Sequence, residues 1–170
     1  IGANVAHASR FQRMGFSVLL PDYRGYGLSQ GNFPTESQVY QDAQVAWEYL
    51  VKQRKIPPQQ IFIYGHSLGG AVAIDLAVKH PDAAGLIVES SFTSVADMVN
   101  HQQIYRIFPV SLLLHQRFNS IDKVGALAVP VLFIHGTADW QVPAGMSQQL
   151  YASAPQPKQI FLVPEAGHNN

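Results

Sequence analysis

Ser67, Asp139 and His168 lie far apart in the 170-residue sequence and have the residue types that nucleophilic catalysis by a serine requires. Ser67 is the centre of the segment Gly-His-Ser-Leu-Gly at 65–69, between an apolar run and a segment with helical periodicity. A serine at such a junction occupies a sharp, strained turn, and a glycine on either side gives it room. The following helix places the Leu68 N–H where an oxyanion would form. The segment therefore predicts a nucleophilic Ser67 with Leu68 as an oxyanion donor.

A nucleophilic serine needs a base, and the base needs an acid to orient it. Asp139 follows the apolar run 131–134, and His168 follows the apolar run 160–163. The carboxyl ends of parallel strands meet at one edge of a sheet, so these side chains are expected to converge on Ser67 in the order serine, acid, histidine. Glu89, which follows the run 86–88, is the alternative acid, but Asp139 fits this order better.

Other readings of these residues are weaker. A dinucleotide site at 65–70 would need a glycine where Ser67 stands, because backbone must approach the pyrophosphate there. The sequence contains no cysteine and no His-Glu-x-x-His spacing, so neither a metal nor another cofactor is predicted. His66 is expected to point away from the nucleophile, and His135 to line the site. No partner motif is evident for His7.

The elements that must position these residues alternate along the chain. Helical periodicity predicts a helix after the capping box of Thr35 and Gln38, a second after Ser67 and a third from Pro143 to about Ala152. Five short apolar runs without alternation predict core strands at 18–20, 61–64, 86–88, 131–134 and 160–163. This order favours an α/β fold with a mostly parallel, doubly wound sheet. The interval 92–128 has no strand signal and is expected to be a short helical, cap-like insertion over the site.

Composition limits the classes of partner. Eleven basic residues balance eleven acidic ones, the charged fraction is 13%, and mean hydropathy is +0.02. Electrostatic capture of nucleic acid is therefore not expected. The longest apolar stretches are much shorter than the roughly 18 residues of a membrane span. A small-molecule partner is the expectation, whereas oligomeric state and location are not determined by the sequence.

The motifs Gly-His-Ser-Leu-Gly-Gly at 65–70, His-Gly-Thr-Ala-Asp at 135–139 and Ala-Gly-His at 166–168 resemble those of the α/β-hydrolase superfamily of serine hydrolases. The loop at 22–29 and the stretch at 89–94 resemble those of the alpha/beta hydrolase domain-containing proteins, a subgroup close to serine aminopeptidases and monoacylglycerol lipase-like proteins. This subgroup includes acyl-protein thioesterases. The resemblance covers essentially all of residues 1–170. It implies Ser67 as nucleophile, Asp139 as acid, His168 as base and Leu68 as one oxyanion donor.

The resemblance also sets expectations for activity and completeness. The leading expectation is a serine hydrolase that cleaves a carboxylic ester or thioester, with a hydrophobic acyl group favoured by the apolar 92–128 interval. The alternatives are a non-catalytic binding module that retains the turn as scaffold, and a serine peptidase of the same fold. The family's first strands, its second oxyanion loop and its final helix would lie outside residues 1–170, so this single core domain is expected to be partial.

Overall fold

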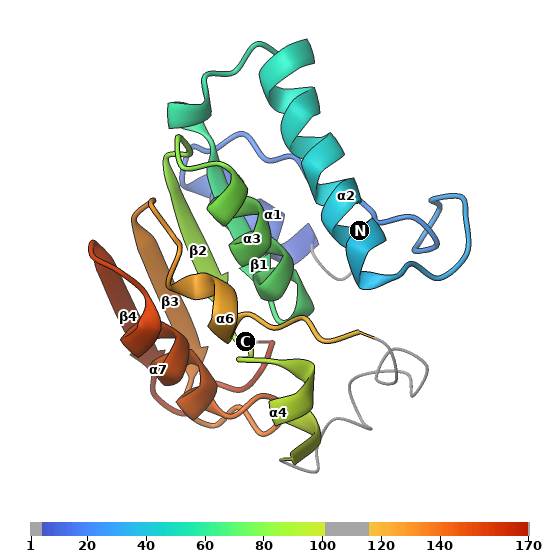
Figure 1. Ribbon diagram of the computed structural model, residues 1–170. Helices are drawn as coiled ribbons and strands as arrows, with labels where there is room; N and C mark the ends of the chain where they lie inside the picture. Colours follow the sequence, from blue (N-terminus) through green and yellow to red (C-terminus); the bar gives the residue numbers. More distant parts are fainter. Residues whose placement is uncertain (1–4, 101–115, 170) are drawn as a thin grey trace.

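The computed structural model describes residues 5–100 and 116–169, and within them the strands form one parallel sheet (Figure 1). The sheet order is β1-β2-β3-β4, and each neighbouring pair is parallel. The register pairs His66 with Glu89 and Glu89 with Ile134, so the strand ends stand side by side. The strands are β1 Phe62–His66, β2 Gly85–Glu89, β3 Val131–Gly136 and β4 Lys158–Val163.

Helices lie on both faces of this sheet, which confirms the doubly wound α/β architecture (Figure 1). One face is covered by α3 and α7, with α2 packed on α3 and α6 packed between α3 and α7. The other face carries α1, whose Phe11 ring contacts Tyr64 of β1. The helices are α1 Val5–Arg13, α2 Glu36–Glu48, α3 Leu68–Lys79, α4 Val95–Asn100, α6 Ile121–Val124 and α7 Ala144–Ser153, with a π turn at Tyr49–Gln53 and a 3-10 turn at Pro58–Gln60.

The three predicted helices form close to their predicted limits. Thr35 caps α2: its side chain accepts from the Gln38 N–H, and the Gln38 side chain accepts from the Thr35 N–H. Such a box satisfies two of the N–H groups that a helix start leaves without partners. The helix α3 begins directly after Ser67. Pro143 is the N-cap of α7 rather than its first helical residue, a difference of one position.

The predicted strand at 18–20 is wrong, because residues 16–23 have no regular secondary structure. A cavity of about 140 Å³ lies beside this segment, and Leu19 and Pro21 line it together with residues of α2, α3 and β1. Leu19 of the predicted run thus lines this cavity, and the run does not extend the sheet.

The ends of the 92–128 interval belong to the core. Phe92, Met98 and Phe118 are fully buried and pack with Val142 and with residues of α2, α3 and α7. Residues 101–115, the middle of the predicted insertion, lie outside the described part of the chain. The cap-like role of the insertion therefore stays a prediction, and the apolar residues at its described ends are explained by core packing. Among the described helices, none combines the length and apolar character of a membrane span.

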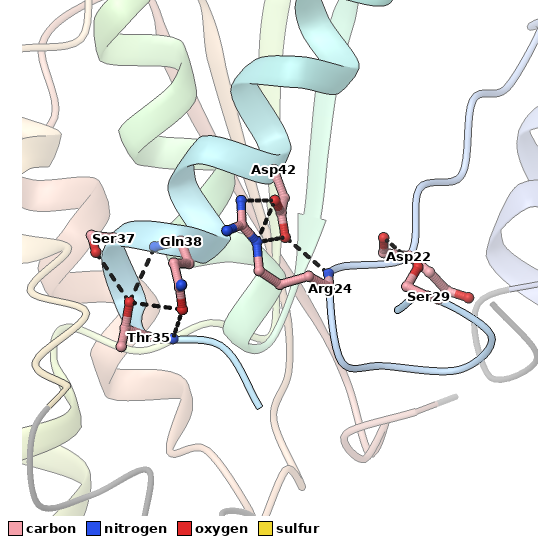
Figure 2. Close-up of polar contacts among 7 residues, drawn as sticks. All are labelled: Asp22, Arg24, Ser29, Thr35, Ser37, Gln38 and Asp42. Atoms are coloured by element: carbon pink, nitrogen blue, oxygen red, sulfur yellow. Dashed lines mark hydrogen bonds and ion pairs between the residues drawn. The ribbon is translucent and has the colours of Figure 1, made fainter. Parts of the chain in front are cut away.

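The loop that follows the 16–21 segment is fastened to α2 by an ion pair (Figure 2). Asp42 accepts hydrogen bonds from the Arg24 guanidinium, at 2.6 and 2.9 Å, and from the Arg24 backbone N–H, at 2.9 Å. Ser29 donates to the Asp22 carbonyl within the same loop. Burial raises the pKa of the Asp42 carboxyl, but the hydrogen bonds and charge of Arg24 outweigh this and leave the pKa below its ordinary value.

We expect Asp42→Asn to lower the free energy of unfolding at pH 7 by an amount that disappears in acid. A carboxyl whose pKa is depressed in the folded state stabilises fully above its unfolded pKa of about 4, and this contribution is lost as pH falls through the folded value. Urea unfolding of wild type and variant at pH 7 and at pH 3 measures the two differences. A gap that stays the same at both pH values would show that the Asp42 charge does not stabilise the loop.

Candidate active site

Ser67 lies in a strained turn between β1 and α3. Its backbone angles are φ 55° and ψ −121°, a combination that residues with side chains seldom adopt. Three hydrogen bonds hold the turn: the Ser67 N–H donates to the Glu89 carbonyl (2.9 Å), and the Ser67 carbonyl accepts from the Ser91 hydroxyl (2.8 Å) and from the Gly70 N–H (2.9 Å). Leu68, the first residue of α3, lies at the helix end where N–H groups have no intrahelical partner. The turn is therefore of the kind predicted from the motif.

The two glycines of the motif differ in what they contribute. A Cβ on Gly65 would lie 2.1 Å from the Gly69 carbonyl oxygen, so β1 and α3 approach each other only because residue 65 has no side chain. A Cβ on Gly69 would have no heavy atom within 4 Å. The expectation that both positions must be free of side chains is therefore correct for Gly65 and wrong for Gly69.

We expect Gly65→Ala to lower the free energy of unfolding by about 3 kcal/mol, since the added methyl group meets backbone that cannot rotate away. Gly69→Ala is the matched control, expected to be neutral or to stabilise α3 by up to about 1 kcal/mol because alanine favours the helix. Urea unfolding of both variants gives the comparison. Equal effects of the two substitutions would contradict the close approach at Gly65.

Asp139 and His168, which are 29 positions apart, form a buried pair. His168 Nδ1 lies 2.7 Å from Asp139 Oδ2, and both residues are 7% exposed. Because a carboxylate only accepts hydrogen bonds, His168 carries its proton on Nδ1, which leaves Nε2 with a lone pair when the ring is neutral. This is the tautomer that a general base needs. The Ser67 hydroxyl forms no hydrogen bond within residues 5–100 and 116–169, and such contacts often tighten only when substrate binds.

Hydrogen bonds join the loop that carries Asp139 to the loop that carries His168. The Ala138 N–H donates to the Ala166 carbonyl (2.9 Å), and the Glu165 N–H donates to the Thr137 hydroxyl (2.9 Å). A Cβ on Gly136 would lie 2.2 Å from the Ala166 carbonyl oxygen, so this approach also needs a glycine. The loops follow the neighbouring strands β3 and β4, and their mutual hydrogen bonds set the distance between acid and imidazole.

His135 is a buried residue of the site whose contact with the acid was not predicted. It is 0% exposed, and its Nε2 lies 2.9 Å from the Val142 carbonyl oxygen and 3.2 Å from Asp139 Oδ2. Both neighbours are acceptors, so Nε2 carries a proton. The other ring nitrogen lies 2.6 Å from the Ser147 hydroxyl. The sequence predicted His135 at a strand end beside the site, and the local turn after β3 brings Asp139, four residues later, back to it.

Asp139 is held in its ionised form. Burial alone raises the pKa of this carboxyl, but hydrogen bonds from His135, His168 and the Val142 N–H, together with the charge of His168, lower it well below its ordinary value. The backbone N–H groups of Gln141 and Val142 both donate to Oδ1 at 2.9 Å. Oδ1 therefore faces backbone and Oδ2 faces the two imidazoles. At neutral pH the carboxylate carries a negative charge beside His168.

Glu89, the alternative acid, has a different partner. Its Oε2 accepts a hydrogen bond of 2.6 Å from the Tyr64 hydroxyl, and His7 lies 3.8 Å away. His7 is thus partnered in the folded protein although no sequence motif indicated this. Burial and the Glu89 hydrogen bond raise the pKa of Tyr64 far above its ordinary value, so this phenol keeps its proton. In residues 5–100 and 116–169, no group of three or more His, Asp or Glu side chains could hold a metal ion.

The chain is similar to known proteins along most of its length. The model of the family described as serine aminopeptidase, S33 matches residues 2–120. An uncharacterized protein of Mycobacterium tuberculosis is 43% identical over 157 residues, which cover 92% of this chain and 54% of that protein. Alpha/beta hydrolase domain-containing protein 17B of Homo sapiens is 33% identical over 160 residues, covering 93% of this chain and 52% of that protein. The chain thus spans about half the length of the curated relatives it matches.

The fold is also that of solved hydrolases. The esterase domain from a Rhodothermus marinus protein superposes with a TM-score of 0.72 at 23% identity, over 98% of this chain and 70% of that one. Likeness at this identity concerns the fold alone. Since the family model covers well over half of the chain, the sequence belongs to the serine aminopeptidase S33 family of α/β hydrolases.

Proposed function

We propose that the protein is a serine hydrolase that cleaves a carboxylic ester or thioester of a small molecule through an acyl-enzyme. Ser67 is the nucleophile, His168 the general base, and Asp139 the acid that orients His168. The observation that supports this most is the buried Asp139–His168 hydrogen bond of 2.7 Å. It lies in loops that follow the carboxyl ends of β3 and β4, and the strained Ser67 follows the carboxyl end of β1 in the same sheet. Strain of this kind costs about 1–3 kcal/mol and is concentrated at functional sites.

The reaction follows from the protonation states of these groups. Ser67 Oγ attacks the carbonyl carbon while its proton moves to Nε2 of His168, and the carbonyl electron pair moves to oxygen. The Leu68 N–H, with the positive end of α3, would stabilise this oxyanion. When the C–O or C–S bond breaks, the leaving group takes the proton from His168. Water then attacks the acyl-enzyme by the same route, which releases the carboxylic acid and restores Ser67.

Labelling of the intact protein with a fluorophosphonate probe tests the proposal. We expect mass spectrometry to find the probe on Ser67, because an activated serine attacks the phosphorus while other serines do not. Ser91, which donates to the Ser67 carbonyl, serves as an internal control and should stay unmodified. A folded protein without label on Ser67 would contradict the proposal and favour a non-catalytic binding module.

A serine aminopeptidase is the second candidate, and the description of the matching family model favours it. Esterases, lipases, thioesterases and peptidases share the same three catalytic groups, so discrimination depends on the pocket. A panel of acyl esters of increasing chain length, acyl thioesters and aminoacyl amides separates these activities by kcat/KM. We expect esters or thioesters to rank above aminoacyl amides, and the reverse order would make the protein a peptidase.

A further inference from the structure

His66, the residue before the candidate nucleophile, contacts the main chain of the candidate base. Its Nε2 lies 2.8 Å from the His168 carbonyl oxygen, and the two imidazole centroids are 4.8 Å apart. A carbonyl only accepts, so His66 Nε2 donates the proton of this hydrogen bond. His168 is therefore held at two points, its Nδ1 by Asp139 and its carbonyl by His66.

The direction of the His66 side chain follows from the alternation of side chains along β1. Gly65 lies against α3, so Tyr64 and His66 point to the opposite face of the sheet, where α1 lies. On that face, His66 borders His7 at a centroid distance of 5.2 Å. This direction agrees with the prediction that His66 points away from the nucleophile. The ring instead contacts the main chain of His168.

The groups around His66 form a fixed support. The Tyr64 hydroxyl donates to Glu89 at 2.6 Å and accepts from His7 Nδ1 at 2.8 Å. This arrangement uses the one hydroxyl proton for the carboxylate, so Nδ1 of His7 carries a proton. His7, Tyr64 and Glu89 come from α1, β1 and β2, and their hydrogen bonds tie these elements together beside His66.

His66 can bond to the His168 carbonyl without placing a positive charge beside the His168 ring. Burial lowers its pKa, as do the neighbouring His168 and His7, while the hydrogen bond to His168 and the charge of Glu89 oppose the shift only in part. At neutral pH the ring is therefore uncharged. A charged His66 would repel the His168 imidazolium that forms when the base takes up the Ser67 proton.

We infer that His66 is a positioning residue: through its hydrogen bond to the His168 carbonyl, it fixes the loop so that Nε2 of His168 is aimed at Ser67. This inference rests on the proposed function. A displacement of about 1 Å in a catalytic group can cost about 10²-fold in rate. His66 acts through His168 and does not itself enter the proton transfer.

The test compares His66→Leu, which removes the donor, with His66→Gln, whose side-chain N–H₂ reaches about as far as Nε2. With a p-nitrophenyl ester, we expect His66→Leu to lower kcat by about 10- to 100-fold with KM nearly unchanged, and His66→Gln to recover most of the loss. The matched control is His80→Leu, since His80 stacks on Trp47 and bonds to Gln44. Its kcat should equal that of wild type.

The outcomes separate this inference from the proposed function. Wild-type protein that takes no fluorophosphonate on Ser67 would overturn the function. Active wild type together with wild-type kcat in His66→Leu, or with His66→Gln as slow as His66→Leu, would overturn the role of His66. Ring ¹⁵N spectra of wild type give a readout that needs no variant. They should show His66 as the neutral tautomer protonated on Nε2, and the Nδ1-protonated or charged ring would contradict the inference.

Discussion

Ser67→Ala is expected to lower kcat for ester hydrolysis by about 10⁴-fold or more and to abolish labelling by a fluorophosphonate. The substitution removes the one atom that would form the acyl bond and leaves the Asp139–His168 pair intact. The rate with a short p-nitrophenyl ester, followed by absorbance, measures the loss. An unchanged rate would mean that another site, or the uncatalysed reaction, produces the signal.

Substitutions of Ser67 are also expected to differ in their free energies of unfolding. Alanine at 67 retains the cost of φ 55° and ψ −121°, whereas glycine adopts this conformation without strain. We therefore expect Ser67→Gly to be as inactive as Ser67→Ala but more stable by about 1 kcal/mol. Urea unfolding of the two variants compares them directly. Equal stability would show that the turn stores no strain.

Asp139→Asn is expected to lower kcat by about 10⁴-fold, the scale of the loss that follows when the acid of a Ser-His-Asp site becomes an amide. The backbone N–H groups of Gln141 and Val142 determine how the new side chain is oriented, because both need an acceptor at the Oδ1 position. The amide N–H₂ must then face His168 Nδ1, which can only accept. The proton of the neutral imidazole moves to Nε2, and His168 can no longer act as a base.

Two comparisons make this prediction specific. Asp42→Asn removes another partly buried carboxylate, one that bonds to Arg24 and contacts neither His168 nor His135, and should leave kcat at pH 7 unchanged. Glu89→Gln changes the alternative acid, which bonds to Tyr64 rather than to an imidazole of the site. We expect Asp139→Asn to lose far more activity than Glu89→Gln. The reverse order would assign the acid to Glu89.

Much of the fold could be predicted because its signals are local. Thr35 and Gln38 are three residues apart and cap α2 within one turn. Four of the five apolar runs form strands: the central strands β2 and β3 are largely covered on both sides, whereas Phe161 of the edge strand β4 is 60% exposed. The fifth run, at 18–20, is equally apolar but forms no strand, and its Leu19 lines a cavity with residues of α2, α3 and β1. Whether a run pairs depends on the neighbour it meets, and no local pattern records that.

For the candidate site, the sequence by itself determined which residues to consider. Glycine at 65 and the positions of Ser67, Asp139 and His168 after apolar runs are properties of the chain, and their catalytic roles stay predictions. Only the tertiary structure decided which groups hold them in place. His135 contacts Asp139 across a local turn of four residues, whereas the contacts of His66 with the His168 carbonyl and of Tyr64 with Glu89 join elements distant in sequence. They are set by strand register and by the face to which each side chain points, which exist only once the sheet has formed.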